Sequence, residues 1–303
     1  MRELLLGLLV LLLVGVLYWA VSGRKAENFL GLTEPFFEGA MTLHSTPSVT
    51  PSPRASGRFS VASFNVHFGY GAEKIAPTLV ANGMGESDII LLQESNEKTA
   101  VQVSSALDMA YAYYPAAVHP TSNDLFGVAI LSRWPILAHR KILLPDKSYF
   151  DAARKAGIVA VINVDGVPIK VVSVHLQSGI LESGYEDQIK SLVDCVTEDD
   201  CHNDSHAKPL PASRALVFGG DFNTWRAGLF KLLEKRMDKA SMRRVGGIER
   251  TFSKDMSKNP KACYTFDYFY ATPEIIAGPG RVGGDRTGSD HYPIAAEFLL
   301  PRS

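Results

Sequence analysis

The sequence has little cysteine and no excess of charge of either sign. Three cysteines among 303 residues are too few for a disulfide-stapled scaffold, and none has the paired CxxC spacing of a structural zinc site. Lysine and arginine number 31 and aspartate and glutamate 32, so the net charge of -1 excludes a wholly basic protein that packages nucleic acid. With 46% hydrophobic and 21% charged residues, the chain is expected to be globular.

One long hydrophobic run stands apart at the amino terminus. Residues 4–21 are 18 consecutive uncharged residues, mostly Leu and Val. As a helix this run would be about 27 Å long, close to the thickness of the bilayer hydrocarbon. Its length favours an uncleaved anchor, although the small residues of Ala20-Val21-Ser22 leave a cleaved signal peptide open. Residues 1–23 are therefore expected to be a transmembrane anchor or signal sequence.

Residues 24–57 are predicted to be a linker, because the Pro-, Ser- and Thr-rich stretch 44–57 has no apolar period.

Charges on the two sides of the hydrophobic run do not fix its orientation in the membrane. Cys195 and Cys201 lie in an acidic stretch and would form a disulfide loop in an oxidising compartment, with two unrelated thiols as the alternative. We expect a membrane-anchored protein with its catalytic domain on the extracytoplasmic side.

Residues 58–303 are predicted to form one folded domain in which short β-rich runs alternate with helical ones. Helical spacing runs through 186–195 and 228–239, and Asp165-Gly166 predicts a hairpin turn. Hairpins mixed with crossover helices favour an α/β fold with a mixed sheet or two stacked sheets over a parallel Rossmann sheet. The predicted strands are 59–66, 89–93, 128–132, 158–164, 169–175, 215–219, 267–271 and 294–299.

Polar side chains that carry chemistry follow or begin several of these strands. A single acid or amide at a strand end is usually a turn residue, but loops that converge at sheet ends bring such residues together. Carboxylates with amides and histidines suit a hard cation such as Mg²⁺, whereas the HExxH pair of zinc hydrolases is absent. The candidates are Asn65, His67, Glu94, His175, Asp221, Asn223, Asp267, Asp290 and His291.

The ordered motifs that contain these residues resemble the endonuclease/exonuclease/phosphatase superfamily, the DNase I-like proteins. The resemblance spans almost all of residues 58–301 and implies a four-layer α/β/β/α sandwich, preceded here by the N-terminal hydrophobic helix. It also implies metal-dependent cleavage of a phosphate ester, with Mg²⁺ as the cofactor and Mn²⁺ as the alternative. The motifs are SFNVH, LLQES, GVAILSRWP, VSVHL, GGDFN, FDYFY and GSDHYPI.

The resemblance assigns metal binding to three positions. Glu94 would be the main metal ligand, with Asn65 and Asp290 beside it. His67 departs from the acidic residue that some family members have two places after the asparagine. This departure leaves open whether a second metal position exists or whether His67 only supports the site.

The resemblance assigns catalysis to five further positions. Asp221 and Asn223 would orient the attacking water and the scissile phosphate, and His175 would donate to a non-bridging phosphate oxygen. Asp267 would hold His291, which fixes the tautomer of the imidazole. Whether Asp221 or His291 activates the water is left open.

The substrate is less constrained than the chemistry. Residues 231–261 contain ten basic and four acidic residues directly after GGDFN, so they are expected near the mouth of the site. Such a stretch could follow a nucleic-acid backbone, rest on anionic lipid headgroups, or be a solvated helix face.

The sequence therefore predicts a membrane-tethered or exported Mg²⁺-dependent phosphoesterase that hydrolyses phosphodiester bonds. A nuclease with low sequence specificity is favoured, with nucleic acid preferred over lipid as the substrate. The alternatives are a lipid phosphodiesterase or phosphatase of the same fold, with a sphingomyelin-like or phosphoinositide substrate, and a non-catalytic binding protein. The membrane would be contacted through residues 4–21, and the sequence indicates no obligate protein partner.

Overall fold

The computed structural model describes residues 42–43, 57–119, 124–147, 154–178, 182–197, 210–255 and 263–301. The predicted helix 1–23 and most of the predicted linker 24–57 lie outside these residues. Within the linker range, the two residues of β1 (Thr42–Leu43) pair with a strand of the folded domain. In the described part of the chain, no helix is both long and apolar enough to cross a membrane.

The described strands form two mixed sheets. The first has the order β1-β4-β5-β3-β2-β14-β12, with β13 also paired to β14, and its β2 and β3 are parallel. Its remaining members are β2 (Arg58–Asn65), β3 (Ile89–Ser95), β4 (Ala110–Val118), β5 (Leu125–Ser132), β12 (Ile276–Ala277), β13 (Arg281–Val282) and β14 (Ile294–Leu299).

The second sheet has the order β10-β11-β9-β8-β7-β6, and its β8 and β9 are parallel. The hairpin between β7 and β8 turns at Asp165 and Gly166, with φ of 54° and 86°, as the Asp-Gly pair predicts. The strands are β6 (Ile136–Lys147), β7 (Arg154–Val164), β8 (Val167–His175), β9 (Leu216–Asp221), β10 (Arg243–Arg244) and β11 (Asp267–Ala271).

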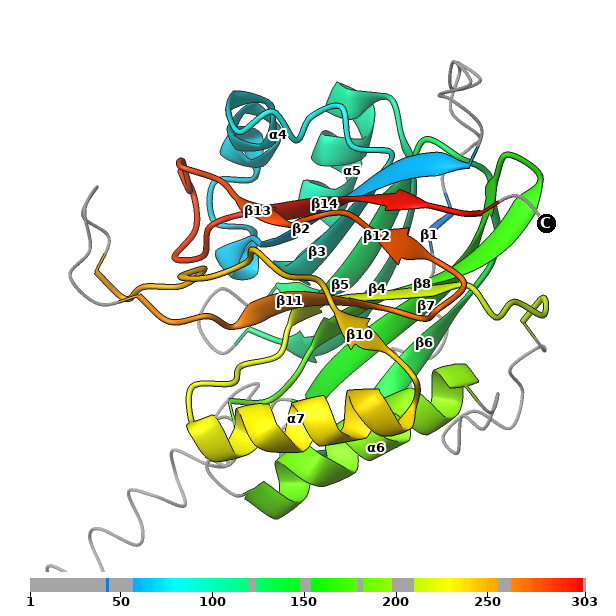
Figure 1. Ribbon diagram of the computed structural model, residues 1–303. Helices are drawn as coiled ribbons and strands as arrows, with labels where there is room; N and C mark the ends of the chain where they lie inside the picture. Colours follow the sequence, from blue (N-terminus) through cyan, green and yellow to red (C-terminus); the bar gives the residue numbers. More distant parts are fainter. Residues whose placement is uncertain are drawn as a thin grey trace, which may run out of the picture.

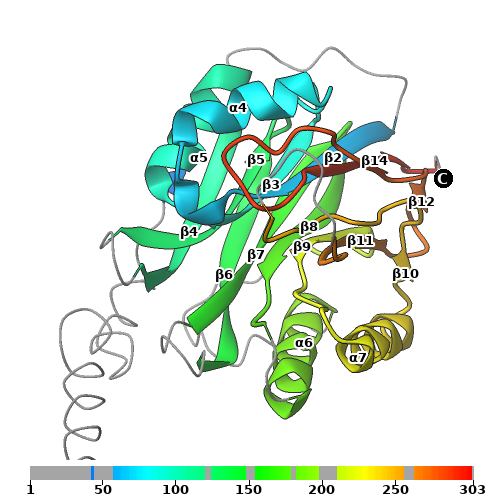
Figure 2. The ribbon, with the colours of Figure 1, turned by 90° about the vertical axis from the view of Figure 1, so that its left-hand side faces the viewer.

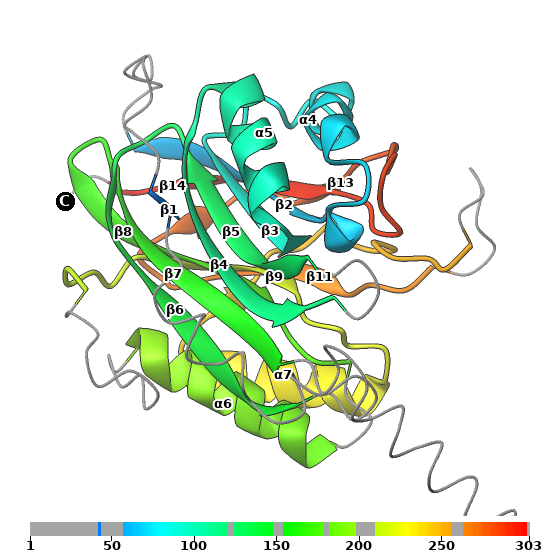
Figure 3. The same ribbon diagram turned by 180° about the vertical axis from the view of Figure 1, so that it is seen from behind.

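Helices lie against the outer side of each sheet (Figures 1 and 2). Helices α4 (Ala72–Ala81) and α5 (Glu97–Leu107) pack on the first sheet, and Ile75 and Val103 share one buried cluster with its Ile90. Helices α6 (Glu182–Thr197) and α7 (Ala227–Lys239) pack on the second sheet through another cluster. The view from behind shows the same two helix pairs on opposite sides (Figure 3).

A third buried cluster fills the space between the sheets. It joins Leu91 and Ile130 of the first sheet to Ile158 and Phe269 of the second. Burial of these aliphatic and aromatic side chains is the main force that holds the sheets together. The predicted α/β class with mixed sheets is confirmed.

The cysteines divide into one bonded and one free among the described residues. Cys195 on α6 is disulfide-bonded, and Cys263 is free. The expected partner, Cys201, lies outside the described residues.

Two glycines at the end of β9 allow the close approach of neighbouring strands. A Cβ on Gly219 would lie 2.5 Å from a ring carbon of Phe269 and 2.8 Å from Leu91 of the other sheet. Gly220 has a φ of 137°, and a Cβ there would lie 2.1 Å from the carbonyl oxygen of Val174. The glycines of GGDFN therefore let Asp221 sit close to the end of β8.

Replacing Gly220 by alanine is expected to lower the free energy of unfolding by at least about 2 kcal/mol, because the new methyl group meets backbone and the φ is unfavourable. Urea unfolding followed by circular dichroism measures this change. Gly246→Ala is the matched control, since a Cβ at Gly246 meets nothing within 4 Å, and it should change stability by less than about 0.5 kcal/mol. Equal stability of the two variants would show that neither the close approach nor the backbone conformation at Gly220 requires glycine.

Candidate active site

Strand ends from both sheets bring the site residues together. Asn65 ends β2, His175 ends β8 and Asp221 ends β9, while Asp267 begins β11. In the second sheet His175 is paired with Asp221, and Asp221 is paired with Asp267. Figure 2 looks onto this end of the two sheets.

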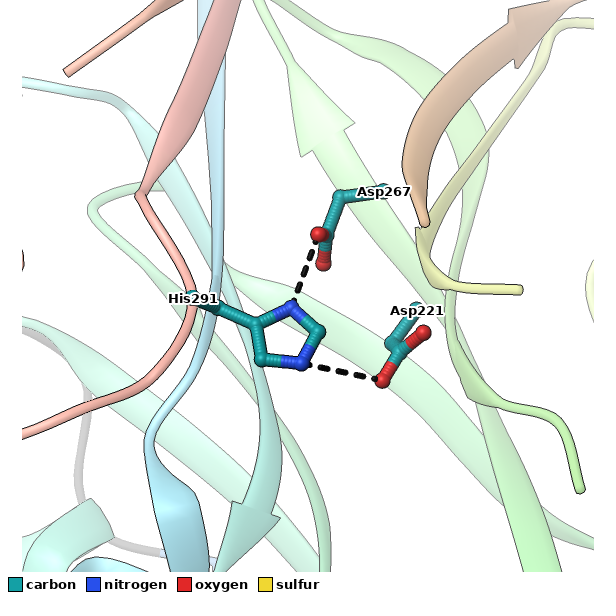
Figure 4. Close-up of side chains that lie close together, drawn as sticks. All are labelled: Asp221, Asp267 and His291. Carbon is teal, nitrogen blue, oxygen red and sulfur yellow. Dashed lines mark hydrogen bonds and ion pairs between the residues drawn. The ribbon is translucent and has the colours of Figure 1, made fainter. Parts of the chain in front are cut away.

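His291 lies between two carboxylates from neighbouring strands (Figure 4). Its Nδ1 is 2.8 Å from Oδ2 of Asp267, and its Nε2 is 3.6 Å from Oδ2 of Asp221. Burial alone would lower the pKa of His291, but the charges of Asp267 and Asp221 raise it to about 10. The predicted pairing of Asp267 with His291 is present, and it leaves Nε2 facing Asp221.

Asp221 is held in place by amide donors. The Asn65 side chain donates its Nδ2 to Oδ2 of Asp221 at 2.9 Å, and the backbone N–H of Asn223 donates to Oδ1 at 2.9 Å. Asn223 in turn donates its side-chain Nδ2 to the carbonyl oxygen of Leu176 at 2.8 Å. Burial raises the pKa of Asp221 to about 7, against the opposing effect of His291. The hydrogen bonds from Asn65 and Asn223 fix the orientation of the Asp221 carboxylate.

His175 brings a lysine into the site that the sequence analysis did not identify. Its Nε2 lies 3.6 Å from both Glu94 Oε1 and Asp221 Oδ2, and Nζ of Lys155 lies 3.2 Å from the same nitrogen. Burial, with a smaller effect of Lys155, holds the pKa of His175 well below its ordinary value. The imidazole is therefore neutral near pH 7, and Lys155 supplies the positive charge at this position.

Glu94 has an unusual backbone conformation for its residue type. Its φ is 51°, and the pairing of β3 with β5 shifts register between Gln93 and Ser95, which marks a β-bulge. A left-handed non-glycine residue costs of order 1 kcal/mol or more, and such residues gather at functional sites. The bulge directs a mostly buried side chain, 13% exposed, toward His175.

A polar bridge between the sheets supports both Glu94 and His175. The fully buried Gln93 donates its Nε2 to Oγ of Ser173 at 3.0 Å and to Oγ of Ser63 at 3.1 Å. Gln93 precedes Glu94, and Ser173 lies two residues before His175. Because a buried amide without partners is costly, this bridge fixes the relative position of the two sheets at the site.

The three predicted metal ligands fit a hard cation by their chemistry. Glu94 and Asp290 are carboxylates, and His67 lies beside Asp290 with its Nδ1 3.2 Å from Oδ1. Oδ1 of Asn65 accepts the backbone N–H of His67 at 3.0 Å. The imidazole beside Glu94 is neutral, so a bound cation would add to the charge of Lys155 in compensating the partly buried carboxylate of Glu94. Among the described residues, no hydrogen bond or ion pair joins Asn65, Glu94 and Asp290 directly.

A second set could also hold a metal ion. Asp221, Asp267 and His291 are buried and place one ligand atom each within 4.8 Å of one another. Asp267 already accepts from His291, and Asp221 already accepts from two amides. The hydrogen bonds favour a proton-linked network for this set.

The loop before β14 is fixed by Ser289 and Arg286, which were not among the candidate site residues. Ser289 donates to the carbonyl oxygen of Asn65 at 2.6 Å and accepts the N–H of His291 at 3.0 Å. The buried Arg286 donates to the carbonyl oxygens of Ser253 and Asp290 at 2.8 and 2.7 Å. These contacts place Asp290 and His291 against the end of β2.

The described part of the basic stretch, residues 231–255, lies only partly near the site. Arg243 is paired with Ala271, at the far end of β11 from Asp267, and Arg244 forms an ion pair with Glu234 at 3.3 Å. The exposed Lys254 is closer, because the preceding Ser253 donates its N–H to the carbonyl oxygen of Asp290. The helical part of the stretch lies over the second sheet, because α7 packs there. The expectation that the stretch lies at the mouth of the site is therefore wrong for this part.

Comparisons with known proteins show the family and the fold of this chain. A model of the endonuclease/exonuclease/phosphatase family matches residues 62–291. Among curated proteins, the comparison finds no match.

Solved structures show the same fold at low sequence identity. The endonuclease/exonuclease/phosphatase from Bacteroides vulgatus has a TM-score of 0.62 and 14% identity, over 80% of this chain and 99% of that one. A humanized D. rerio TDP2 with 14 mutations has a TM-score of 0.59 and 16% identity, over 80% of this chain and 99% of that one. The mannosyl-6-phosphatase of Bacteroides thetaiotaomicron has a TM-score of 0.58 and 16% identity, over 80% of this chain and 99% of that one. On the family match, the chain belongs to the endonuclease/exonuclease/phosphatase family and is a phosphoesterase hydrolase.

Proposed function

We propose that this protein is a Mg²⁺-dependent phosphodiesterase that cleaves nucleic acid with little sequence specificity. The observation that carries the chemistry is the continuous set of contacts from Asp267 through His291 and Asp221 to His175 and Glu94. A phosphodiester is already anionic, so attack by water needs positive charge at the phosphate and an acceptor for the proton of the water.

Asn65, Glu94 and Asp290 would hold the Mg²⁺, with Mn²⁺ as the alternative ion. When bound, the cation supplies charge neutralisation at the phosphate oxygens. Asn65 links this set to catalysis, because its amide also donates to Asp221. The four-layer α/β/β/α arrangement that the family implies is supported by the three buried clusters.

Asp221, Asn223 and His291 act on the reacting groups. Asp221 orients the attacking water and takes its proton as the new P–O bond forms and the bond to the leaving oxygen breaks. Asn223 fixes Asp221 and faces the scissile phosphate. Asp267 keeps a proton on Nδ1 of His291 and thereby fixes the direction of Nε2 toward Asp221.

His175 and Lys155 contact the non-bridging phosphate oxygens. Because the imidazole is neutral, the ammonium of Lys155 carries the charge that stabilises the transition state on this side. Replacing Lys155 by methionine is expected to lower kcat/KM for bis(p-nitrophenyl) phosphate about 10²-fold, with unchanged melting temperature. Lys235→Met, at an exposed position on α7, is the control and should leave kcat/KM unchanged. Equal rates in both variants would remove Lys155 from the site.

Nucleic acid is favoured by groups that flank the site. The exposed Trp225 follows Asn223 by two residues, and the guanidinium of Arg226 lies 4.1 Å from the centre of its ring. An aromatic ring with a neighbouring cation suits a base and a phosphate of a nucleic-acid strand. Contacts of this kind do not read the sequence, so we expect low specificity.

We also propose that residues 4–21 anchor the protein in a membrane and that the catalytic domain lies on its extracytoplasmic side. The long hydrophobic run supports the anchor. The disulfide-bonded Cys195 supports an oxidising compartment.

The proposed function is tested by assaying the full-length protein with Mg²⁺ on plasmid DNA, RNA, sphingomyelin vesicles and phosphoinositide vesicles. We expect cleavage of DNA or RNA by the wild type and its loss in Asp221→Asn. Turnover of the lipids alone would contradict the nuclease assignment and support a lipid-directed enzyme of the same fold. A folded protein that binds Mg²⁺ and cleaves none of the four would contradict the proposal as a whole.

A further inference from the structure

A cluster of four ring side chains lies beside the site and has no part in the hydrolysis described above. The ring centres of Phe68 and His119 are 4.5 Å apart, those of Tyr70 and His119 are 5.6 Å apart, and those of His67 and Tyr70 are 5.7 Å apart. Tyr70 and His119 are also linked by a hydrogen bond, because the hydroxyl of Tyr70 lies 3.2 Å from Nε2 of His119. We call this the ring cluster: His67, Phe68, Tyr70 and His119.

The backbone that carries three of these rings is strained. His67 and Phe68 in η1 (His67–Gly69) have φ of 48° and 58°. A bulky residue such as phenylalanine rarely adopts a left-handed conformation, at a cost of order 1 kcal/mol or more per residue. Strain of this kind persists only where the surrounding structure holds it, and strained residues cluster at functional sites.

The surroundings hold the strained segment in one conformation. The N–H of His67 is bound by Oδ1 of Asn65 at 3.0 Å. Gly69 has a φ of 69°, and a Cβ there would lie 2.5 Å from Oγ1 of Thr99. Below the cluster, the buried Phe126 packs edge-on against Phe68, with ring centres 5.0 Å apart and an angle of 84°. The rings are therefore fixed before any ligand arrives.

The ring cluster is fixed but open to solvent. Tyr70 is 46% exposed, and His67, Phe68 and His119 are half-buried. It also begins at the reaction centre, because Nδ1 of His67 lies 3.2 Å from Oδ1 of Asp290. A group attached to a phosphate bound beside Asp290 would therefore lie near these rings.

We propose that the ring cluster is a stacking subsite for the nucleobase next to the scissile phosphate, an inference that rests on the proposed function. Unstacked bases are commonly bound on the faces of Phe, Tyr, Trp and His side chains. Three of the four rings carry a polar nitrogen or oxygen, which suits the polar edge of a base. A lipid acyl chain would instead select aliphatic and fully apolar aromatic side chains.

The test compares two single-stranded DNA oligonucleotides, one of thymidine and one with abasic residues at every position. We expect Tyr70→Ala to raise KM for the thymidine strand about tenfold and to leave KM for the abasic strand unchanged. Tyr70→Phe should retain the wild-type value, because the ring face remains. Val80→Ala, at an exposed position on α4, is the control for loss of a surface side chain.

A binding measurement separates failure of the subsite from failure of the proposed function. Fluorescence anisotropy gives the dissociation constants of both labelled strands with the wild type in EDTA, where cleavage plays no part. Tighter binding of the thymidine strand, lost in Tyr70→Ala, supports the subsite even if no strand is cleaved. Equal affinity for the two strands, or an equal loss on both in Tyr70→Ala, would overturn it.

Discussion

Glu94→Gln is expected to lower the rate of phosphodiester hydrolysis at least about 10²-fold without lowering the stability of the fold. The substitution keeps the size of the side chain but removes the charge that would bind the cation. Stability is expected to stay within about 1 kcal/mol of the wild type, because among the described residues Glu94 contacts a neutral imidazole at 3.6 Å and its substitution breaks no short hydrogen bond.

Binding of the cation by Glu94 can also be measured without an activity assay. In the wild type, Mg²⁺ should raise the melting temperature, since a ligand that binds only the folded state stabilises it. The shift should shrink in Glu94→Gln and persist in Glu274→Gln, an exposed position far from the site. If Glu94→Gln kept both the full Mg²⁺ shift and the full rate, Glu94 would have no role in metal binding.

Asp267→Asn and His291→Gln are expected to lower kcat by a similar factor of about 10² to 10⁴. Asp267 holds Nδ1 of His291 at 2.8 Å, and an asparagine can present an N–H there and reverse the tautomer. Since the two residues act as one unit, the double variant should be little worse than either single variant.

Steady-state kinetics of the two single variants and the double variant form a cycle that measures this coupling. Asp238→Asn, an exposed position on α7, is the control and should keep the wild-type kcat. Fully additive losses would show that Asp267 and His291 contribute independently, against the pairing seen in Figure 4.

Much of the site could be predicted because its residues occur at the ends of recognisable strands. The runs that end at Asn65, His175 and Asp221 contain β-forming residues, and each ends in a polar residue. Parallel pairing of β8 with β9 then places His175 beside Asp221. The family resemblance carried by the motifs implied the pairing of Asp267 with His291, which are 24 positions apart.

Other elements gave no usable pattern. Strand β4 is buried along its whole length, and its continuous apolar run, with Pro115 at a register shift, does not distinguish a strand from a buried helix. Helix α4 carries Pro77 in its interior, which argues against a helix in sequence. Tertiary packing on the first sheet overrides both local signals.

The roles of Lys155 and of the ring cluster could not be predicted from the sequence, for a different reason. Lys155 lies near the start of β7 in a segment without a motif, and its position beside His175 follows only from tertiary structure. The left-handed conformation of His67 and Phe68 has no glycine or asparagine signal at those two positions. These residues reach the site through backbone geometry that periodicity does not report.

We propose that Asn65, Glu94 and Asp290 bind a cation that this site needs for phosphodiester hydrolysis. The most direct measurement is the rate of bis(p-nitrophenyl) phosphate hydrolysis by the full-length protein after treatment with EDTA and after return of Mg²⁺ or Mn²⁺. We expect no activity after chelation, recovery in the wild type with either ion, and no recovery in Glu94→Gln. Full activity in EDTA, or equal recovery in Glu94→Gln, would contradict it.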